Sequence, residues 1–315
     1  MKRFGTFSGV FTPSILTILG VIMYLRFPTI LGQAGLVNTL GIIVVAHIIS
    51  VTTSLSLASL ATDKTVKTGG TYFMISRSLG LPIGGTLGIA LYIGLSFSVS
   101  LYILGFSESF LSVFNIEPTL NNIRLAGGTF LTLITIVTFI STKLVLRTQF
   151  FIMGAMVLSL LSIFFGQHEF APSHINMTPI ANAAPFMLLF GIFFPAVTGF
   201  EAGVAMSGDL KDAKKSLPLG AISAVAVGFV IYVILAFFYA YTVDANMLAN
   251  DSDILYKISL VPALVVAGIW GATLSSAFGS ILGAPRILQA IAMDKMGHPF
   301  FAKGTRKNNE PHNAL

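Results

Sequence analysis

Two long hydrophobic segments of this sequence are each interrupted by proline, glycine and a charged side chain. The first is Gly9–Gly35 (GVFTPSILTILGVIMYLRFPTILGQAG), which contains Arg26, and the second is Pro185–Leu210 (PFMLLFGIFFPAVTGFEAGVAMSGDL), which contains Glu201. Each is long enough to cross a bilayer, but proline and glycine break the hydrogen bonding of a regular helix. Broken segments at corresponding positions of two halves are typical of secondary transporters built from inverted repeats.

The composition is that of an all-α integral membrane protein. Of the 315 residues, 55% are hydrophobic and only 10% are charged, and the mean hydropathy is +0.87. Soluble domains carry about 25% charged residues. No nucleophile–base set, zinc-protease motif or phosphate-binding loop stands out, so we expect neither an enzyme nor a resident cofactor.

Eight segments are apolar over about 20 residues or more, the length that a bilayer requires. They are 8–31, 37–62, 82–111, 125–143, 148–167, 185–207, 217–242 and 260–288. Two inverted repeats of about five spans each would need about ten. We therefore expect one transmembrane domain over 1–315, with a first five-helix repeat at 1–168, a partial second repeat at 184–293 and a cytoplasmic tail at 294–315. We expect helices one and six to be the broken ones, and the chain to be truncated after its eighth span.

Lysine and arginine fall mainly in alternate loops. Of the 18, only Arg26, Arg124 and Lys257 lie away from the side of the N-terminus. The others are Lys2, Arg3, Lys64, Lys67, Arg77, Lys143, Arg147, Lys211, Lys214, Lys215, Arg286, Lys295, Lys303, Arg306 and Lys307. Since basic loops stay cytoplasmic, we expect a multi-pass protein of the plasma (inner) membrane with both termini inside. This pattern explains the net charge of +6 without a nucleic-acid partner. In the inner loop 63–80 we expect a short helix.

Four stretches, spread in order over nearly the whole chain, carry a resemblance to a known family. They are Gly9–Gly35, Gly69–Gly80 (GGTYFMISRSLG) running on to Leu101–Ser109 (LYILGFSES), Phe193–Gly220 (FFPAVTGFEAGVAMSGDLKDAKKSLPLG) and Gly271–Met296 (GATLSSAFGSILGAPRILQAIAMDKM). The chain resembles the cation-chloride cotransporter branch of the amino acid–polyamine–organocation (APC) superfamily. The resemblance implies an inverted-repeat transporter fold.

The resemblance implies a sodium site between spans one and eight. A break in a membrane helix frees carbonyl oxygens for a cation. The matching positions are the carbonyls of Leu16, Leu19 and Ala272 and the hydroxyls of Ser275 and Ser276. The alternative is that these serines bond back to their own helical turn or pack against a neighbour.

For potassium, the resemblance implies oxygen ligands from both broken helices and span three. The matching residues are Thr17, Ile18, Tyr102, Pro195 and Thr198. Thr17 departs from the family pattern, which usually has asparagine at this position, and offers a shorter oxygen-bearing side chain.

For chloride, the resemblance implies the N–H groups of Gly20, Val21 and Ile22, where the helix dipole favours an anion. A second anion or substrate site would include Gly199, Phe200 and Glu201. At about 4 Å, an ionised glutamate would repel a chloride by one to several kcal/mol. Glu201 also matches a glutamate found in many amino acid permeases of the superfamily. It could hold a substrate ammonium, carry a proton or brace the broken helix.

Three further polar residues lie inside predicted spans. Arg26 and Glu108 match family positions that line the extracellular vestibule, so the resemblance implies an outer gate, with snorkelling to the interface as the alternative. His47 is alone in span two, and we expect it to bond to a neighbouring helix.

The leading interpretation is a secondary active symporter that uses a sodium gradient to move chloride, potassium or both. The first alternative is an ion-coupled amino acid permease of the same fold, indicated by Glu201 and Thr17. The second is a non-transporting membrane fragment or scaffold, indicated by the absence of ninth and tenth spans. The expected partners are small ions or amino acids and the lipid bilayer, with a homodimer as a candidate assembly. The only ions expected are the transported Na⁺, Cl⁻ and K⁺.

Overall fold

The computed structural model describes residues 4–63, 69–140, 142–166, 170–205, 207–304, 311 and 313–314, and the side chains of 140–147 and 209 are not among those described. Part of the predicted basic inner surface therefore lies outside the described residues or side chains. These residues are Lys2, Arg3, Lys64, Lys67, Lys143, Arg147, Arg306 and Lys307.

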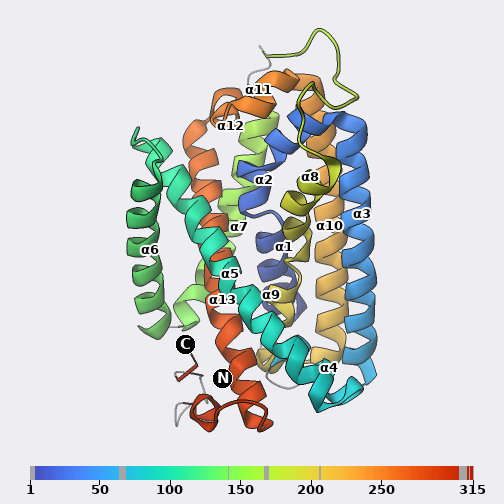
Figure 1. The fold of residues 1–315 in the computed structure, drawn as a ribbon, viewed down its shortest axis with the longest axis vertical. Helices are drawn as coiled ribbons and strands as arrows, with labels where there is room; N and C mark the ends of the chain where they lie inside the picture. Colours follow the sequence, from blue (N-terminus) through green and yellow to red (C-terminus); the bar gives the residue numbers. More distant parts are fainter. Residues whose placement is uncertain are drawn as a thin grey trace.

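Long helices running along one axis form the molecule (Figure 1). They are α3 (Phe27–Asp63), α5 (Leu81–Val113), α6 (Leu120–Ile140), α7 (Thr142–Phe164), α10 (Ala213–Thr242) and α13 (Pro262–Met293). The shorter helices are α1 (Thr12–Ile18), α2 (Val21–Leu25), α4 (Gly70–Leu79), α8 (Phe186–Phe193), α9 (Glu201–Val204), α11 (Ala245–Asn250) and α12 (Ile254–Ile258). Helix α4 lies at one end of the bundle, and α11 and α12 lie at the other (Figure 1).

The described chain has the membrane spans that the sequence predicts. Seven helical segments are long and apolar enough to cross a bilayer, and Thr148–Phe164 is a further, shorter apolar helix. Helix α3 is kinked at Gly35, where φ is 71° and ψ is 168°. The kink separates predicted spans one and two, and α4 is the short helix expected within 63–80. The protein is thus an all-α integral membrane protein with about eight spans.

The two broken segments lie in the middle of the bundle (Figure 1). Helix α1 contacts α7, α10 and α13, while α10 packs along α3 and α13 packs along α5. Three buried aromatic rings fill the centre: the Tyr232 ring meets those of Phe27 and Phe193 edge-on, with centroids 5.2 and 5.0 Å apart. Long helices with apolar outer faces therefore enclose short helices whose ends are buried.

Candidate functional site

The first broken segment loses its helical conformation at two residues. Helix α1 ends at Ile18, Leu19 has φ −90° and ψ 37°, and Gly20 has φ −88° and ψ −146° before α2 begins. The last carbonyls of one helix and the first N–H groups of the next have no partner within their own helix. The end of α1 therefore favours a cation, and the start of α2 favours an anion.

Three oxygen atoms surround this break. A Cβ atom built on Gly20 would lie 2.8 Å from the Thr17 carbonyl oxygen. It would also lie 3.4 Å from Ser276 Oγ and 3.5 Å from the Leu16 carbonyl oxygen. Ser276 Oγ is buried and has no hydrogen-bond partner among the described residues. A free hydroxyl and main-chain carbonyls thus lie close together beside Gly20 in the buried interior, and oxygen ligands are those that a small hard cation prefers.

The other members of the predicted sodium set lie on the same two elements. Leu19 forms the break itself, and Ala272 and Ser275 are buried on α13 beside Ser276. Helices α1 and α13 are in contact. A cation bound here would therefore tie the first broken segment to the eighth span.

In the second broken segment, serine hydroxyl groups donate hydrogen bonds to main-chain carbonyls. Helix α8 continues as a 3₁₀ turn over Phe194–Thr198 before α9 begins at Glu201. Ser50 Oγ donates to the Val197 carbonyl at 2.8 Å, and Ser14 Oγ donates to the Phe200 carbonyl at 3.1 Å. Sequence reasoning missed both serines. Their only signal was a hydroxyl in the middle of an apolar span.

The two breaks touch each other. A Cβ atom built on Gly199 would lie 2.8 Å from the Ile18 amide nitrogen and 2.8 Å from Thr17 Cβ. Only glycine allows this approach of the two main chains. A change in the position of either broken segment is therefore transmitted directly to the other.

A cavity of about 570 Å³ begins at this contact and reaches α4. Its wall near the breaks includes Thr17, Tyr102, Thr198, Gly199 and Glu201. Towards α4 it is lined by Thr53, Ser56, Leu57 and Leu60 of α3, Thr71 and Ile75 of α4, Leu87, Ala90, Leu91, Gly94, Leu95 and Ser98 of α5, Ala202 and Ala205, and Gly279, Ser280 and Gly283 of α13. Among these lining residues, Glu201 is the only one with a charged side chain.

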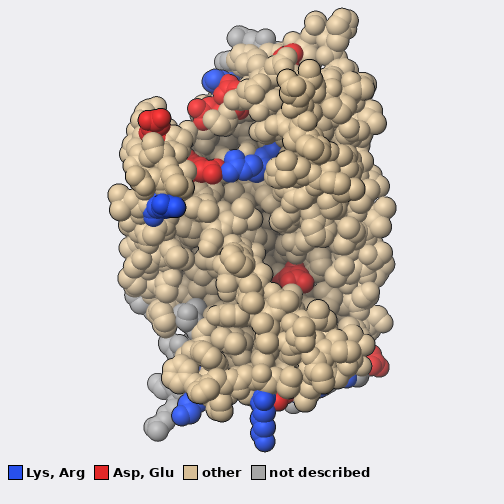
Figure 2. Space-filling view, viewed as in Figure 1, with Lys and Arg blue, Asp and Glu red and all other residues tan. Residues whose placement is uncertain are grey.

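One face of the molecule also shows few charged side chains at mid-height (Figure 2). On the face in Figure 2, most charged side chains lie toward the two ends, and an acidic group lies in a hollow at mid-height. When ionised, a carboxyl group in a largely apolar cavity attracts cations and repels anions.

Only some of the predicted potassium ligands line the cavity. Thr17, Tyr102 and Thr198 line the cavity, whereas Ile18 and Pro195 do not. The Ile18 carbonyl accepts a hydrogen bond from the Tyr232 hydroxyl at 2.8 Å, and the Pro195 carbonyl accepts one from Thr198 Oγ1 at 2.8 Å.

The predicted chloride ligands lie at the start of α2 and outside the cavity wall. Val21 and Ile22 are buried, and Gly20 precedes them as the helix N-cap. The second predicted anion or substrate set lies elsewhere, because Gly199 and Glu201 line the cavity while Phe200 is buried behind them.

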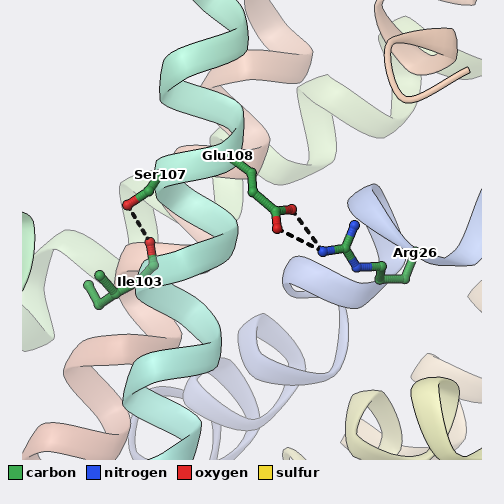
Figure 3. A network of polar contacts seen from close by, with 4 residues as sticks. All are labelled: Arg26, Ile103, Ser107 and Glu108. Carbon is green, nitrogen blue, oxygen red and sulfur yellow. Dashed lines mark hydrogen bonds and ion pairs between the residues drawn. The ribbon is translucent and has the colours of Figure 1, made fainter. Parts of the chain in front are cut away.

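Arg26 and Glu108 form an ion pair (Figure 3). Arg26 Nη2 donates to both carboxylate oxygens of Glu108, at 3.0 and 2.8 Å. Beside the pair, Ser107 Oγ donates to the Ile103 carbonyl of its own helix at 2.8 Å. The structure therefore brings the two predicted gate residues together, joining the end of α2 to α5.

Helix α4, at the other end of the cavity, is held by Asp294. The Asp294 carboxylate accepts hydrogen bonds from the Tyr72 hydroxyl at 2.9 Å and from Arg77 at 2.6 Å. Burial and the bond to Asp294 raise the pKa of Tyr72 to about 12, so its hydroxyl remains a donor at neutral pH. The beginning of the predicted tail is thus attached to the bundle.

His47 does not make the expected bond to a neighbouring helix. Its Nδ1 lies 2.8 Å from the Ile43 carbonyl of its own helix, and its Nε2 is buried with no partner among the described residues. The ring packs edge-on against Phe229 and Tyr232 of α10. The His47 ring therefore makes aromatic contacts with the neighbouring helix in place of the predicted hydrogen bond. These contacts could not be predicted from the hydropathy of the span.

Comparison with known proteins decides the family. The sequence profile named "Amino acid permease" matches residues 9–315 of the chain. The chain belongs to the amino acid permease family. Members of this family are transporters rather than enzymes, in agreement with the sequence prediction.

Several relatives of this permease-family chain are known. A Schizosaccharomyces pombe protein described as an uncharacterized transporter is 33% identical, over 99% of this chain and 33% of its own length. Human solute carrier family 12 member 9 is 32% identical, over 94% of this chain and 38% of its own length. Mouse solute carrier family 12 member 8 is 33% identical, over 99% of this chain and 46% of its own length. The chain thus spans between a third and a half of these relatives. This similarity agrees with the resemblance seen in the four sequence stretches.

Proposed function

We propose that this permease-family chain forms the core of a sodium-coupled symporter. The observation that carries the proposal is the buried, unpartnered hydroxyl of Ser276 beside the Leu16 carbonyl at the first break. A buried hydroxyl without a partner costs about 1–3 kcal/mol, and a bound cation removes that cost. The predicted set consists of neutral oxygen ligands and contains no carboxylate, which favours a monovalent over a divalent cation.

Sodium bound here would couple to solute through the contact between the breaks. The ion would hold α1 against α13, and the Thr17–Gly199 approach would carry this constraint to the wall of the cavity. By linkage, a solute that prefers the same arrangement binds more tightly when sodium is present, and sodium binds more tightly when the solute is present.

Chloride is the leading coupled solute in this proposal. The N–H groups at the start of α2 have no partner within their own helix, and they support it because the dipole of a helix favours an anion at its N-terminus. Potassium has less support, because the Ile18 and Pro195 carbonyls each already accept a hydrogen bond.

An amino acid is the second candidate solute. Glu201 lines a cavity of about 570 Å³, within the range of sites that hold small organic molecules. The Glu201 carboxylate would pair with a substrate ammonium group.

In the cell, we propose that the α4 end faces the cytoplasm of a plasma or inner membrane. The distribution of Lys and Arg supports this orientation. Labelling of single cysteines introduced at Arg77 and at Lys257 would test it, because the chain has no cysteine of its own. Labelling of position 77 from outside intact cells would reverse the proposed orientation.

The function is tested by radiotracer uptake into proteoliposomes under an imposed sodium gradient. The tracers are chloride, rubidium in place of potassium, and a mixed amino acid pool. Sodium-driven chloride uptake supports the leading proposal, and sodium-driven amino acid uptake supports the second candidate. Equal uptake with and without the sodium gradient, for every tracer, contradicts sodium coupling.

A further inference from the structure

Tyr232 is a buried polar residue that the proposed transport cycle has not used. It lies on α10, is 0% exposed, and donates its hydroxyl proton to the Ile18 carbonyl at 2.8 Å. Ile18 is the last residue of α1, so this carbonyl is one of those that the break leaves without a helical partner. The seventh span therefore supplies the hydrogen bond that the broken helix lacks.

The Ile18 carbonyl is directed toward α10. Neither Ile18 nor Tyr232 lines the cavity, although the preceding residue, Thr17, does. The Ile18 side chain also packs closely on α10, because a Cβ atom built on Gly228 would lie 2.6 Å from Ile18 Cγ2. The carbonyl and the side chain of Ile18 are thus both held toward α10.

The Tyr232 ring has little freedom to move. It is enclosed by the rings of Phe27, Phe193 and His47, with centroid separations of 5.2, 5.0 and 6.2 Å. A ring packed on several sides holds its hydroxyl in one position. The hydrogen bond to Ile18 is therefore built into the core rather than made by a mobile side chain.

We infer that Tyr232 is a specificity-determining residue that restricts the first break to sodium by holding the Ile18 carbonyl toward α10, away from the Leu16 carbonyl and the Ser276 hydroxyl. This inference rests on the proposed sodium coupling. Potassium is larger than sodium and needs a larger set of oxygen ligands, so selection between them depends on how many carbonyls can turn toward the ion. With the Ile18 carbonyl engaged by Tyr232, the Leu16 carbonyl and Ser276 hydroxyl remain for a small ion.

The test substitutes Tyr232→Phe, which removes the hydroxyl and keeps the ring. The matched control is Tyr239→Phe, a buried tyrosine on the same helix whose ring also packs on Phe27. Purified protein is titrated with ²²Na⁺ in the presence of increasing KCl or, as a control for ionic strength, choline chloride. The ratio of sodium to potassium affinity is expected to fall about tenfold in the Tyr232 variant, the size of effect given by one buried hydrogen bond, and to stay unchanged in the control.

Each result has a defined meaning. An unchanged ratio in a Tyr232→Phe protein that still binds sodium overturns the inference. If that variant does not fold, the wild-type protein provides the test. The inference is also contradicted if potassium displaces ²²Na⁺ from the wild type as effectively as unlabelled sodium does. Absence of any saturable ²²Na⁺ binding to the wild type is a different failure, since it removes the proposed sodium coupling itself.

Discussion

The two broken helices meet in the centre of the molecule, yet they solve the problem of an interrupted helix differently. The first break is abrupt and leaves the hydroxyl of Ser276 unpartnered beside the Leu16 carbonyl. The second is gradual, and serine hydroxyls of α1 and α3 satisfy the carbonyls of Phe200 and Val197. The first break offers neutral oxygens to a ligand, whereas the second offers the carboxylate of Glu201 to the cavity.

This difference indicates a division of labour within one fold. Carbonyls in a membrane interior must find a partner, so whichever carbonyls the protein itself satisfies are withdrawn from ligand binding. The second break is mainly a braced wall that carries a charge. The first break is the place where we propose that an ion completes the structure.

The largest expected effect comes from removing the free hydroxyl of the first break. The double variant Ser275→Ala, Ser276→Ala should abolish sodium-dependent uptake in proteoliposomes, because the cation loses its side-chain ligands. Thr273→Val on the same helix is the control, since its hydroxyl already donates to the Ile269 and Trp270 carbonyls. Unchanged sodium dependence in the double variant would rule out the site.

A methyl group between the two breaks should separate them. Gly199→Ala places a Cβ atom 2.8 Å from the Ile18 amide nitrogen, so main chain must move. Overpacking of this kind costs about 1–3 kcal/mol, and a lower melting temperature by differential scanning fluorimetry is the expected result. Gly191→Ala is the control, because beyond the neighbouring backbone of its own helix no atom lies within 4 Å of the position that its Cβ atom would take. Equal melting temperatures would show that the breaks are not tightly apposed.

Removing the negative charge of Glu201 at the second break should change the uptake of the coupled solute but not the dependence of uptake on sodium. Glu201→Gln is expected to spare or improve sodium-driven chloride uptake, because it removes a charge that repels chloride. If the coupled solute is an amino acid, the same variant should lose its uptake by about tenfold or more. Glu117→Gln in an exposed loop is the control. Loss of sodium dependence itself would contradict the division between the two breaks.

Breaking the Arg26–Glu108 ion pair near the first break should have a smaller effect, on the access of reagents to the cavity. Glu108→Gln is expected to increase, by a few-fold, the rate at which a thiol reagent added from that side modifies Thr198→Cys. A half-exposed pair contributes about 0.2–1 kcal/mol, which sets this scale. Adding Arg26→Gln should give no further increase, because the pair is already broken. Additive effects of the two substitutions would argue against a gate formed by the pair.

An effect of similarly small size is expected from one brace of the second break. Ser50→Ala leaves the Val197 carbonyl without its donor and should lower stability by about 1 kcal/mol. Thr52→Ala is the control, because its hydroxyl is exposed and bonds only to its own helix. A melting temperature that stays at the control value would indicate that the second break is not braced by α3.

Much of this architecture could be predicted from the sequence, because it depends on local chemistry. Hydropathy predicts the spans, and proline and glycine predict the breaks at Gly20 and in Phe194–Thr198. The amphipathic inner loop predicts α4. The Arg26–Glu108 ion pair also forms between the two residues chosen from the family resemblance.

The braces could not be predicted, because they depend on how distant helices face each other. Nothing near Tyr232 in the sequence indicates that its hydroxyl reaches Ile18, 214 positions away. The same holds for the bond of Ser50 to Val197 and for Asp294, which holds α4 through Tyr72. His47 shows the reverse case, in which a polar residue expected to bond across helices bonds to its own.

Sodium binding to the purified protein tests the central claim most directly. Equilibrium binding of ²²Na⁺ is measured for the wild type, for Thr273→Val and for the double variant Ser275→Ala, Ser276→Ala. We predict saturable binding to the first two and none to the double variant. Saturable binding of equal affinity in all three proteins would contradict the claim that the first break is completed by a sodium ion.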